Sequence, residues 1–312
     1  MSISATIAVL SSKKWLDYQL LDSGGGLKLE RFGPYVFVRP EVQAMWKRLL
    51  PQSDWGQAAA IFKPSGEEAG GHWDFKRKVA DKWELSYPLD LPPGESGSFD
   101  GQLRFWAMTT PGRHLGVFPE AAPNWDFVAD AVKTAGRPAK VLNLFGYTGL
   151  VSLAAAAAGA QVTHVDASRK SVDWARQNQA LSNLNDKPIR WIVDDALKFV
   201  LREIRRGAHY DGILIDPPKF GRGPKGEVWE VFKSLPQLMH ACRQLLSPDP
   251  LFLVLTVYAV KASAIHLGQL LAEVSTDFGG TLEVGELANR EGGGANEGRL
   301  LSQAVFARWR RA

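Results

Sequence analysis

Four aspartates follow three predicted strands that succeed one another along the chain. Asp166 follows an apolar run at 162–165, Asp194 and Asp195 follow 189–193, and Asp216 follows 210–215. Parallel strands end at one edge of a sheet, and the ligands of open α/β sheets bind outside that edge. The four carboxylates are therefore expected to line one ligand site.

A turn with two glycines precedes Asp166. The segment LNLFGYTG starts as an apolar run, typical of a strand that is buried on both faces. Gly146 and Gly149 bracket the turn, where missing side chains let a ligand approach the backbone. Asp166 ends the next strand, where a carboxylate can accept hydrogen bonds from both ribose hydroxyls. The turn lacks the G-x-G-x-x-G pattern that binds a pyrophosphate, and so favours a nucleoside with an amino-acid tail. Taken alone, this stretch fits an ordinary strand–helix–strand unit equally well.

Two prolines come directly after Asp216. Pro217 and Pro218 fix the backbone and remove two donors, which leaves carbonyl groups and a carboxylate. Such an acceptor-only pocket suits an amino group or ring N–H of an extruded base, with Phe220 packing on the base. A rigid loop with a structural role is the alternative.

Alternating strands and helices over 114–312 predict a doubly wound, mostly parallel sheet of seven strands, with one antiparallel edge strand. Asn124 and Ser168 are the expected N-caps of two helices. A helix is predicted at 228–246, and 289–298 is expected to be a mobile loop because it is polar and rich in glycine.

Residues 1–113 predict a small, mainly antiparallel β-rich domain, with a boundary near Arg113. Its run HWDFKRK mixes aromatic and basic side chains, which suits stacking on bases and contacting phosphates. The candidate substrate contacts there are Trp73, Lys76, Arg77 and Lys78. A hairpin with a solvated basic edge is the alternative.

Composition narrows the classes of function. The net charge of +4 and the single cysteine allow an anionic partner and exclude a disulfide framework within the chain. The six histidines show no metal-ligand spacing, so no metal is expected. No apolar run is long enough to span a bilayer, and no signal peptide is recognisable, so a cytoplasmic protein is expected.

The motifs LNLFGYTG, HVDAS, DDALKF and DPPKF, together with GVFPEAAPNWDF ahead of them, resemble class I S-adenosylmethionine-dependent methyltransferases. More narrowly, over 116–257 they resemble the bacterial family that methylates large-subunit ribosomal RNA. The resemblance implies the class I, Rossmann-like methyltransferase sheet, S-adenosylmethionine as cofactor and RNA as partner. It places Phe145, Gly146, Thr148 and Gly149 around the methionine part of the cofactor, Asp166 at the ribose, and Asp194 and Asp195 at the adenine amino group, with Ser168 as a further cofactor contact. Asp216, Pro217, Lys219 and Phe220 would face the base, and Asp216 would also border the cofactor.

The sequence departs from the members of that family that methylate cytosine C5. Those members carry a nucleophilic cysteine after the fifth strand, where this chain reads LTVYA over 255–259. Cys242 lies in a predicted helix, and a lone helical cysteine is usually a small buried hydrophobe. No compact RNA-binding module is expected ahead of the hairpin domain.

We therefore expect direct methyl transfer to a nitrogen of an RNA base. The alternatives are methyl transfer to a small molecule or a protein, and a non-catalytic RNA-binding protein that retains the fold. A nicotinamide dehydrogenase is disfavoured by the FGYTG turn.

Overall fold

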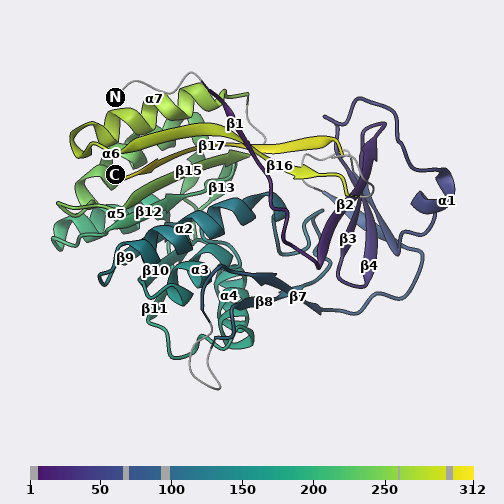
Figure 1. The fold of residues 1–312 in the computed structure, drawn as a ribbon, viewed down its shortest axis with the longest axis horizontal. Coiled ribbons are helices and arrows are strands. Elements are labelled where there is room, and N and C mark those ends of the chain that lie inside the picture. The colour runs from purple at the N-terminus through teal and green to yellow at the C-terminus, as the bar shows by residue number, and fades with distance from the viewer. Residues whose placement is uncertain (1–5, 66–69, 93–98, 259–260, 293–297) are drawn as a thin grey trace.

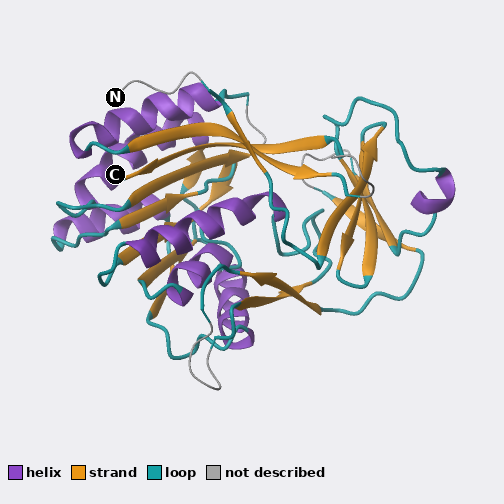
Figure 2. Ribbon diagram, in the orientation of Figure 1, coloured by secondary structure: helices purple, strands orange, loops and turns teal. Residues whose placement is uncertain are grey.

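A computed structural model describes residues 6–65, 70–92, 99–258, 261–292 and 298–312. Its main feature is an eight-stranded sheet with helices on both faces (Figures 1 and 2). The strand order is β1 (Ala8–Leu10), β16 (Thr281–Arg290), β17 (Leu300–Arg310), β15 (Phe252–Tyr258), β12 (Gly212–Ile215), β9 (Lys140–Leu144), β10 (Gln161–Asp166) and β11 (Ile189–Val193).

The five strands from β15 to β11 are parallel and form the centre of the fold. Successive residues of these strands pack into two different cores. Leu142 and Ile213 pack with the helices α5 (Ala196–Arg205), α6 (Val231–Leu245) and α7 (Ala264–Ser275). Val141 and Leu214 pack instead with α2 (Ala122–Thr134) and α3 (Leu150–Ala157). Burial on both faces explains the continuous apolar runs in the sequence.

The seven predicted strands are present, and β1 adds an eighth, which pairs in parallel with β16. The predicted position of the antiparallel strand at the sheet edge is wrong. The antiparallel strand β17 lies inside the sheet, between β15 and β16. The edge strand on this side is β1, which pairs in parallel with β16. Because β1 lies far from the last hairpin in the sequence, the pattern of that hairpin does not predict it.

Two predicted helix starts are also wrong. Helix α2 has Ala121 as its N-cap, and Asn124 lies within the helix, where its Nδ2 donates to Thr256 Oγ1 at 3.2 Å. Helix α6 starts at Val231 because residues 228–230 form strand β14 (Val228–Glu230), paired with β13 (Phe220–Arg222). By contrast, Ser168 is confirmed as the N-cap of α4 (Arg169–Leu181), since its side chain accepts from Ser171 N.

The described N-terminal elements form two smaller sheets. One contains β2 (Tyr18–Gly24), β3 (Leu27–Phe32), β4 (Tyr35–Pro40), β5 (Ala60–Pro64) and β6 (Gly71–Phe75), with the short helix α1 (Gln52–Trp55) between β4 and β5. The other pairs β7 (Trp83–Pro88) with β8 (Gln102–Ala107) and packs on α4, where Asn178 and Ser182 accept from backbone N–H groups of β8.

The domain boundary near Arg113 stays a prediction. None of the helices in the described ranges is long and apolar enough to cross a membrane.

The predicted mobile loop at 289–298 is partly ordered. Strand β16 continues to Arg290, and Glu291 is buried at 6% exposure, while residues 293–297 lie outside the described residues. Arg299 explains this order. It pairs with Glu291 at 2.7 Å and with the buried Asp22 of β2 at 2.7 Å, and so fastens the last hairpin to the N-terminal sheet.

We predict that Arg299→Ala lowers the free energy of unfolding by about 3 kcal/mol, because it leaves two buried carboxylates without their cation. Arg311→Ala is the control, since its pair with the exposed Asp249 is open to solvent and should matter by less than about 1 kcal/mol. Urea unfolding of both variants measures the difference. Equal small effects would show that Arg299 contributes no more than a surface ion pair.

Candidate active site

A cavity of about 1420 Å³ opens at the carboxyl ends of the parallel strands. All the predicted cofactor-contacting residues line it: Phe145, Gly146, Thr148, Gly149, Asp166, Ser168, Asp194, Asp195 and Asp216. Pro217, Lys219 and Phe220 line it too. The N-terminal sheet contributes Lys28 and Arg39 to the same cavity, so both parts of the chain form its wall.

The glycine turn fits tightly over strand β10. A Cβ at Gly146 would lie 2.3 Å from His164 Cε1, which no side chain tolerates. The neighbouring residues Phe145 and Tyr147 have φ of 58° and 49°, an uncommon conformation for non-glycine residues. Gly149 has φ of 86° and precedes α3 directly. The turn therefore packs closely on β10, and its residues line the cavity.

Asp166 is held by the turn above it. Its Oδ2 accepts from Tyr147 N at 2.9 Å and its Oδ1 accepts from Ser168 N at 2.8 Å. Burial raises the pKa of Asp166, while these two hydrogen bonds lower it. Because each carboxylate oxygen has a second lone pair, the group can still accept hydrogen bonds from two hydroxyls.

Thr148 lies in the cavity wall but its side chain faces the protein. Its Oγ1 donates to Gly116 O at 2.7 Å, and its carbonyl oxygen accepts from Asn178 of α4 at 2.9 Å. These bonds fix the turn against the segment that contains Gly116. Thr148 therefore supports the shape of the turn through buried contacts.

Asp194 and Asp195 are both bound locally. Asp195 caps α5 by accepting from Lys198 N at 2.9 Å, and Asp194 forms an ion pair with Arg202. Asp194 also accepts from Asp195 N at 2.8 Å. Each aspartate keeps an oriented carboxylate at the cavity, which suits recognition of an amino group.

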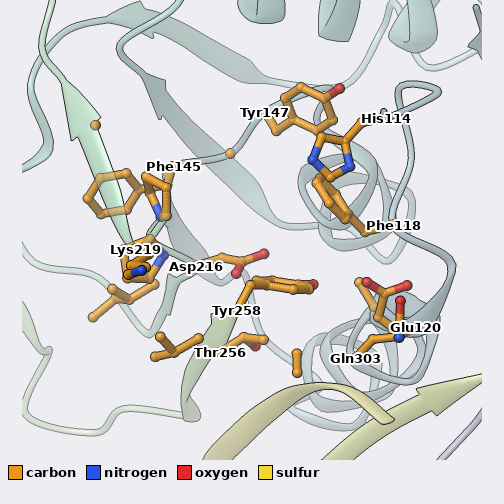
Figure 3. A pocket seen from close by; sticks show the side chains of 18 of the residues that line it. His114, Phe118, Glu120, Phe145, Tyr147, Asp216, Lys219, Thr256, Tyr258 and Gln303 are labelled. Atoms are coloured by element: carbon orange, nitrogen blue, oxygen red, sulfur yellow. The ribbon is translucent and has the colours of Figure 1, made fainter. Parts of the chain in front are cut away.

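Asp216 stands at the centre of the cavity (Figure 3). Its Oδ1 is buried and has no hydrogen-bond partner among the described residues. Burial, and then the nearby Glu120 carboxylate, raise the pKa of Asp216 well above its usual value. The acceptor-only pocket stays a prediction, because a protonated Asp216 would donate as well as accept.

Trp229 connects the two motifs that meet at Asp216. Its indole Nε1 donates to Pro218 O at 2.8 Å, and its ring lies 4.8 Å from that of Phe145. Trp229, Glu120 and Tyr258 were not predicted as site residues from the sequence. Glu120 lies within the GVFPEAAPNWDF stretch, and Tyr258 lies at the end of β15, so position along the chain was the available signal for both.

The basic and aromatic run of β6 does not line this cavity. Trp73 donates to Thr110 O at 2.9 Å and packs edge-on against Phe62, with ring centroids 5.2 Å apart. Lys76 pairs with Asp74, and hydrogen bonds from Lys63 and Lys76 lower the pKa of Asp74 to about 2. Lys76, Arg77 and Lys78 are exposed.

The fold and the cavity together define an α/β protein with a nucleoside-type ligand site at the carboxyl edge of its sheet. A family model described as S-adenosylmethionine-dependent methyltransferase matches residues 100–274. The chain belongs to this family. The chain is similar to an S-adenosylmethionine-dependent methyltransferase from Agrobacterium tumefaciens whose crystal structure is known, with 48% sequence identity and a TM-score of 0.88. The match covers 98% of this chain and 94% of that chain.

Curated relatives match over shorter stretches. Ribosomal RNA large subunit methyltransferase K/L from Shewanella sp. strain MR-4 is 38% identical over 120 residues, which are 38% of this chain and 16% of that protein. Ribosomal RNA large subunit methyltransferase I from Salmonella arizonae is 32% identical over 151 residues, which are 45% of this chain and 34% of that protein. The match therefore spans well under half of either relative.

The chain is an enzyme that uses S-adenosylmethionine. The cavity fits this cofactor on its own chemistry: the glycine turn lines it, and the Asp166 carboxylate beside the turn has lone pairs left to accept from two hydroxyls. When bound, the cofactor supplies an activated methyl group. The individual roles of Phe145, Ser168, Asp194 and Asp195 stay predictions.

We predict that Asp166→Ala weakens S-adenosylmethionine binding about ten- to hundred-fold. Losing charge-assisted hydrogen bonds to the ribose costs about 1.5–3 kcal/mol. Calorimetric titration measures the affinity, and Asp173→Ala on the exposed face of α4 serves as control. Unchanged affinity in a folded Asp166→Ala variant would remove the ribose assignment.

Proposed function

We propose that this methyltransferase modifies a base of RNA, ribosomal RNA in the first place, by direct transfer without a covalent enzyme–RNA intermediate. The observation that carries the proposal is the Asp216-Pro217-Pro218 segment, which presents an unpartnered carboxyl oxygen inside the cavity. The names of the curated relatives support RNA as the substrate. A cytoplasmic location follows from that substrate and stays a prediction.

Direct transfer is supported by the state of the chain's one cysteine. Cys242 lies in α6 with 1% exposure, packed in the core that includes Leu238 and Leu253. Burial raises the pKa of its thiol, which removes the thiolate needed to attack a pyrimidine ring. The segment LTVYA over 255–259 contains no cysteine, so it supplies no thiol. A base nitrogen attacks an activated methyl group without any such nucleophile.

Positioning is then the main work of the protein. Asp216 and the Pro217 carbonyl would orient the target base, and Phe220, 56% exposed at the cavity, would cover its face. Lys219 also lines the cavity and is proposed to contact the substrate. The N-terminal residues Trp73, Lys76, Arg77 and Lys78 are proposed to hold RNA away from the reacting base, through the exposed basic side chains.

The direct mechanism predicts different outcomes at Asp216 and Cys242. Asp216→Ala should lower the rate of methyl transfer by about a hundred-fold or more, with cofactor affinity nearly intact, because an orienting contact is lost. Cys242→Ser should remain active, because a buried thiol contributes packing alone. Single-turnover methylation of unmodified ribosomal RNA measures both variants. An inactive Cys242→Ser protein, or a stable adduct between the wild type and RNA containing 5-fluorocytidine, would establish a cysteine mechanism.

The proposed RNA contact of the N-terminal sheet predicts a change in salt dependence. Changing Lys76, Arg77 and Lys78 together to alanine should weaken RNA binding and reduce its dependence on salt concentration, since fewer counterions are released. Cofactor binding should not change. Fluorescence anisotropy with labelled ribosomal RNA fragments, repeated over a salt series, gives the slope. The same slope in the triple variant and the wild type would rule out this surface.

A further inference from the structure

Three buried polar atoms of the active-site cavity have no hydrogen-bond partner among the described residues. They are Asp216 Oδ1, Asn124 Oδ1 and Tyr258 Oη, and all three residues line the cavity. Burying a polar atom without a partner costs free energy, so such a group in a native protein calls for a ligand or a water. In Figure 3 the Asp216 carboxyl group points into the cavity, and Tyr258 lies between Asp216 and Glu120.

Glu120 is a second carboxyl group in the same cavity. It belongs to the short 3-10 helix η1 (Pro119–Ala121) and is 4% exposed, and its Oε2 accepts from Asn289 Nδ2 at 3.3 Å. Its charge acts on both Asp216 and Tyr258, and raises the pKa of each. The three groups therefore form one electrostatic cluster, to which the β16 side chain Asn289 is bound.

The surroundings of the two carboxyl groups differ in charge. Burial raises the pKa of Glu120, while Lys28 and Arg39 of the N-terminal sheet lower it. No cation is among the causes that act on Asp216. Two nearby cations therefore favour the charged form of Glu120, and none does so for Asp216. The charged and titratable groups around Glu120 are Lys28 and Glu30 of β3, Arg39 of β4, Tyr18 of β2, Asp216 after β12, and Tyr258 of β15.

We propose that Asp216 and Glu120 act as a pair on an exocyclic amino group of a nucleobase. Asp216 holds the edge of the base as a neutral carboxyl group, and Glu120 takes up the proton that the amino group releases. The inference rests on the proposed function, and adds to it the class of methyl acceptor and a second catalytic residue.

The chemistry of an amino acceptor needs both groups. A neutral carboxyl group donates one hydrogen bond and accepts another, which matches a ring nitrogen beside an amino group. During transfer the nitrogen–carbon bond forms while the sulfur–carbon bond breaks, and sulfur keeps the bonding electron pair. The nitrogen then carries one proton too many. Glu120, which lines the same cavity, accepts this proton.

Single-turnover methylation of unmodified ribosomal RNA, measured as a function of pH, tests the pair. The wild-type rate should fall as the pH drops through the pKa of Glu120, because a protonated Glu120 takes up no proton. Glu120→Gln should lower the rate at neutral pH by about a hundred-fold and abolish that acid limb. Glu120→Asp should restore part of the rate and the limb. Glu84→Gln, an exposed carboxyl group of β7, is the control and should behave like the wild type.

Asp216 variants test its neutral state. Asparagine also donates and accepts, so Asp216→Asn should keep the rate within about tenfold of the wild type, whereas Asp216→Ala should not. Digestion of the methylated RNA should release a nucleoside methylated on its exocyclic amine. An Asp216→Asn protein as inactive as Asp216→Ala, an acid limb that persists in Glu120→Gln, or methylation at a ring carbon would overturn the pair.

Infrared spectroscopy gives a readout that does not depend on RNA. The wild type should show a protonated-carboxyl band at neutral pH that Asp216→Asn removes. In Glu120→Gln this band should disappear at lower pH than in the wild type, because removing the Glu120 charge lowers the pKa of Asp216. Absence of the band in the wild type overturns the pair. If the band is present but the wild type methylates no RNA, the pair is supported and RNA as substrate is rejected.

Discussion

The site depends on one steric constraint, the contact between the glycine turn and strand β10. Gly146 sits against His164 so closely that no Cβ fits between them. Phe145 and Tyr147, on either side of this glycine, have positive φ, and each residue makes a contact that shapes the cavity. The Tyr147 N–H points at Asp166, while the Phe145 ring packs on Trp229. Trp229 in turn donates to Pro218 O, so contacts of the turn residues connect Asp166 with the Asp-Pro-Pro segment.

The buried polar layer under the turn keeps that contact rigid. Asn143 Nδ2 donates to Ser152 Oγ at 2.9 Å, and Ser152 Oγ lies 3.0 Å from His164 Nδ1. Burial lowers the pKa of His164 to about 3, so the ring stays neutral at physiological pH and brings no charge under the cofactor. A neutral ring can pack against the glycine without the desolvation cost that an imidazolium would add.

Sequence reasoning was strongest where the information is local. The strand ends at Asp166, Asp195 and Asp216 follow from short apolar runs, and parallel topology brings strand ends to one edge. The capping by Ser168 is likewise a property of neighbouring residues. The order of Asn289 to Glu291 was not readable in this way. It depends on Arg299 and on Asp22, which lies 277 residues earlier, whereas the local composition is that of a flexible loop.

The same distinction explains why a cofactor is easier to infer than an acceptor. Strand ends of one βαβ series suffice to hold a nucleoside, so its ligands sit in recognisable motifs. The part of the cavity that is proposed to hold the acceptor is assembled from distant segments: Lys28 and Arg39 from the N-terminal sheet, Glu120 from a 3-10 turn, and Tyr258 from β15. None of these residues has a local pattern, and their protonation depends on each other's charges. Since burial makes an uncompensated charge costly, the cations of the N-terminal sheet favour the charged form of Glu120. The proposed acceptor site therefore depends on how the two sheets meet, which no single motif encodes.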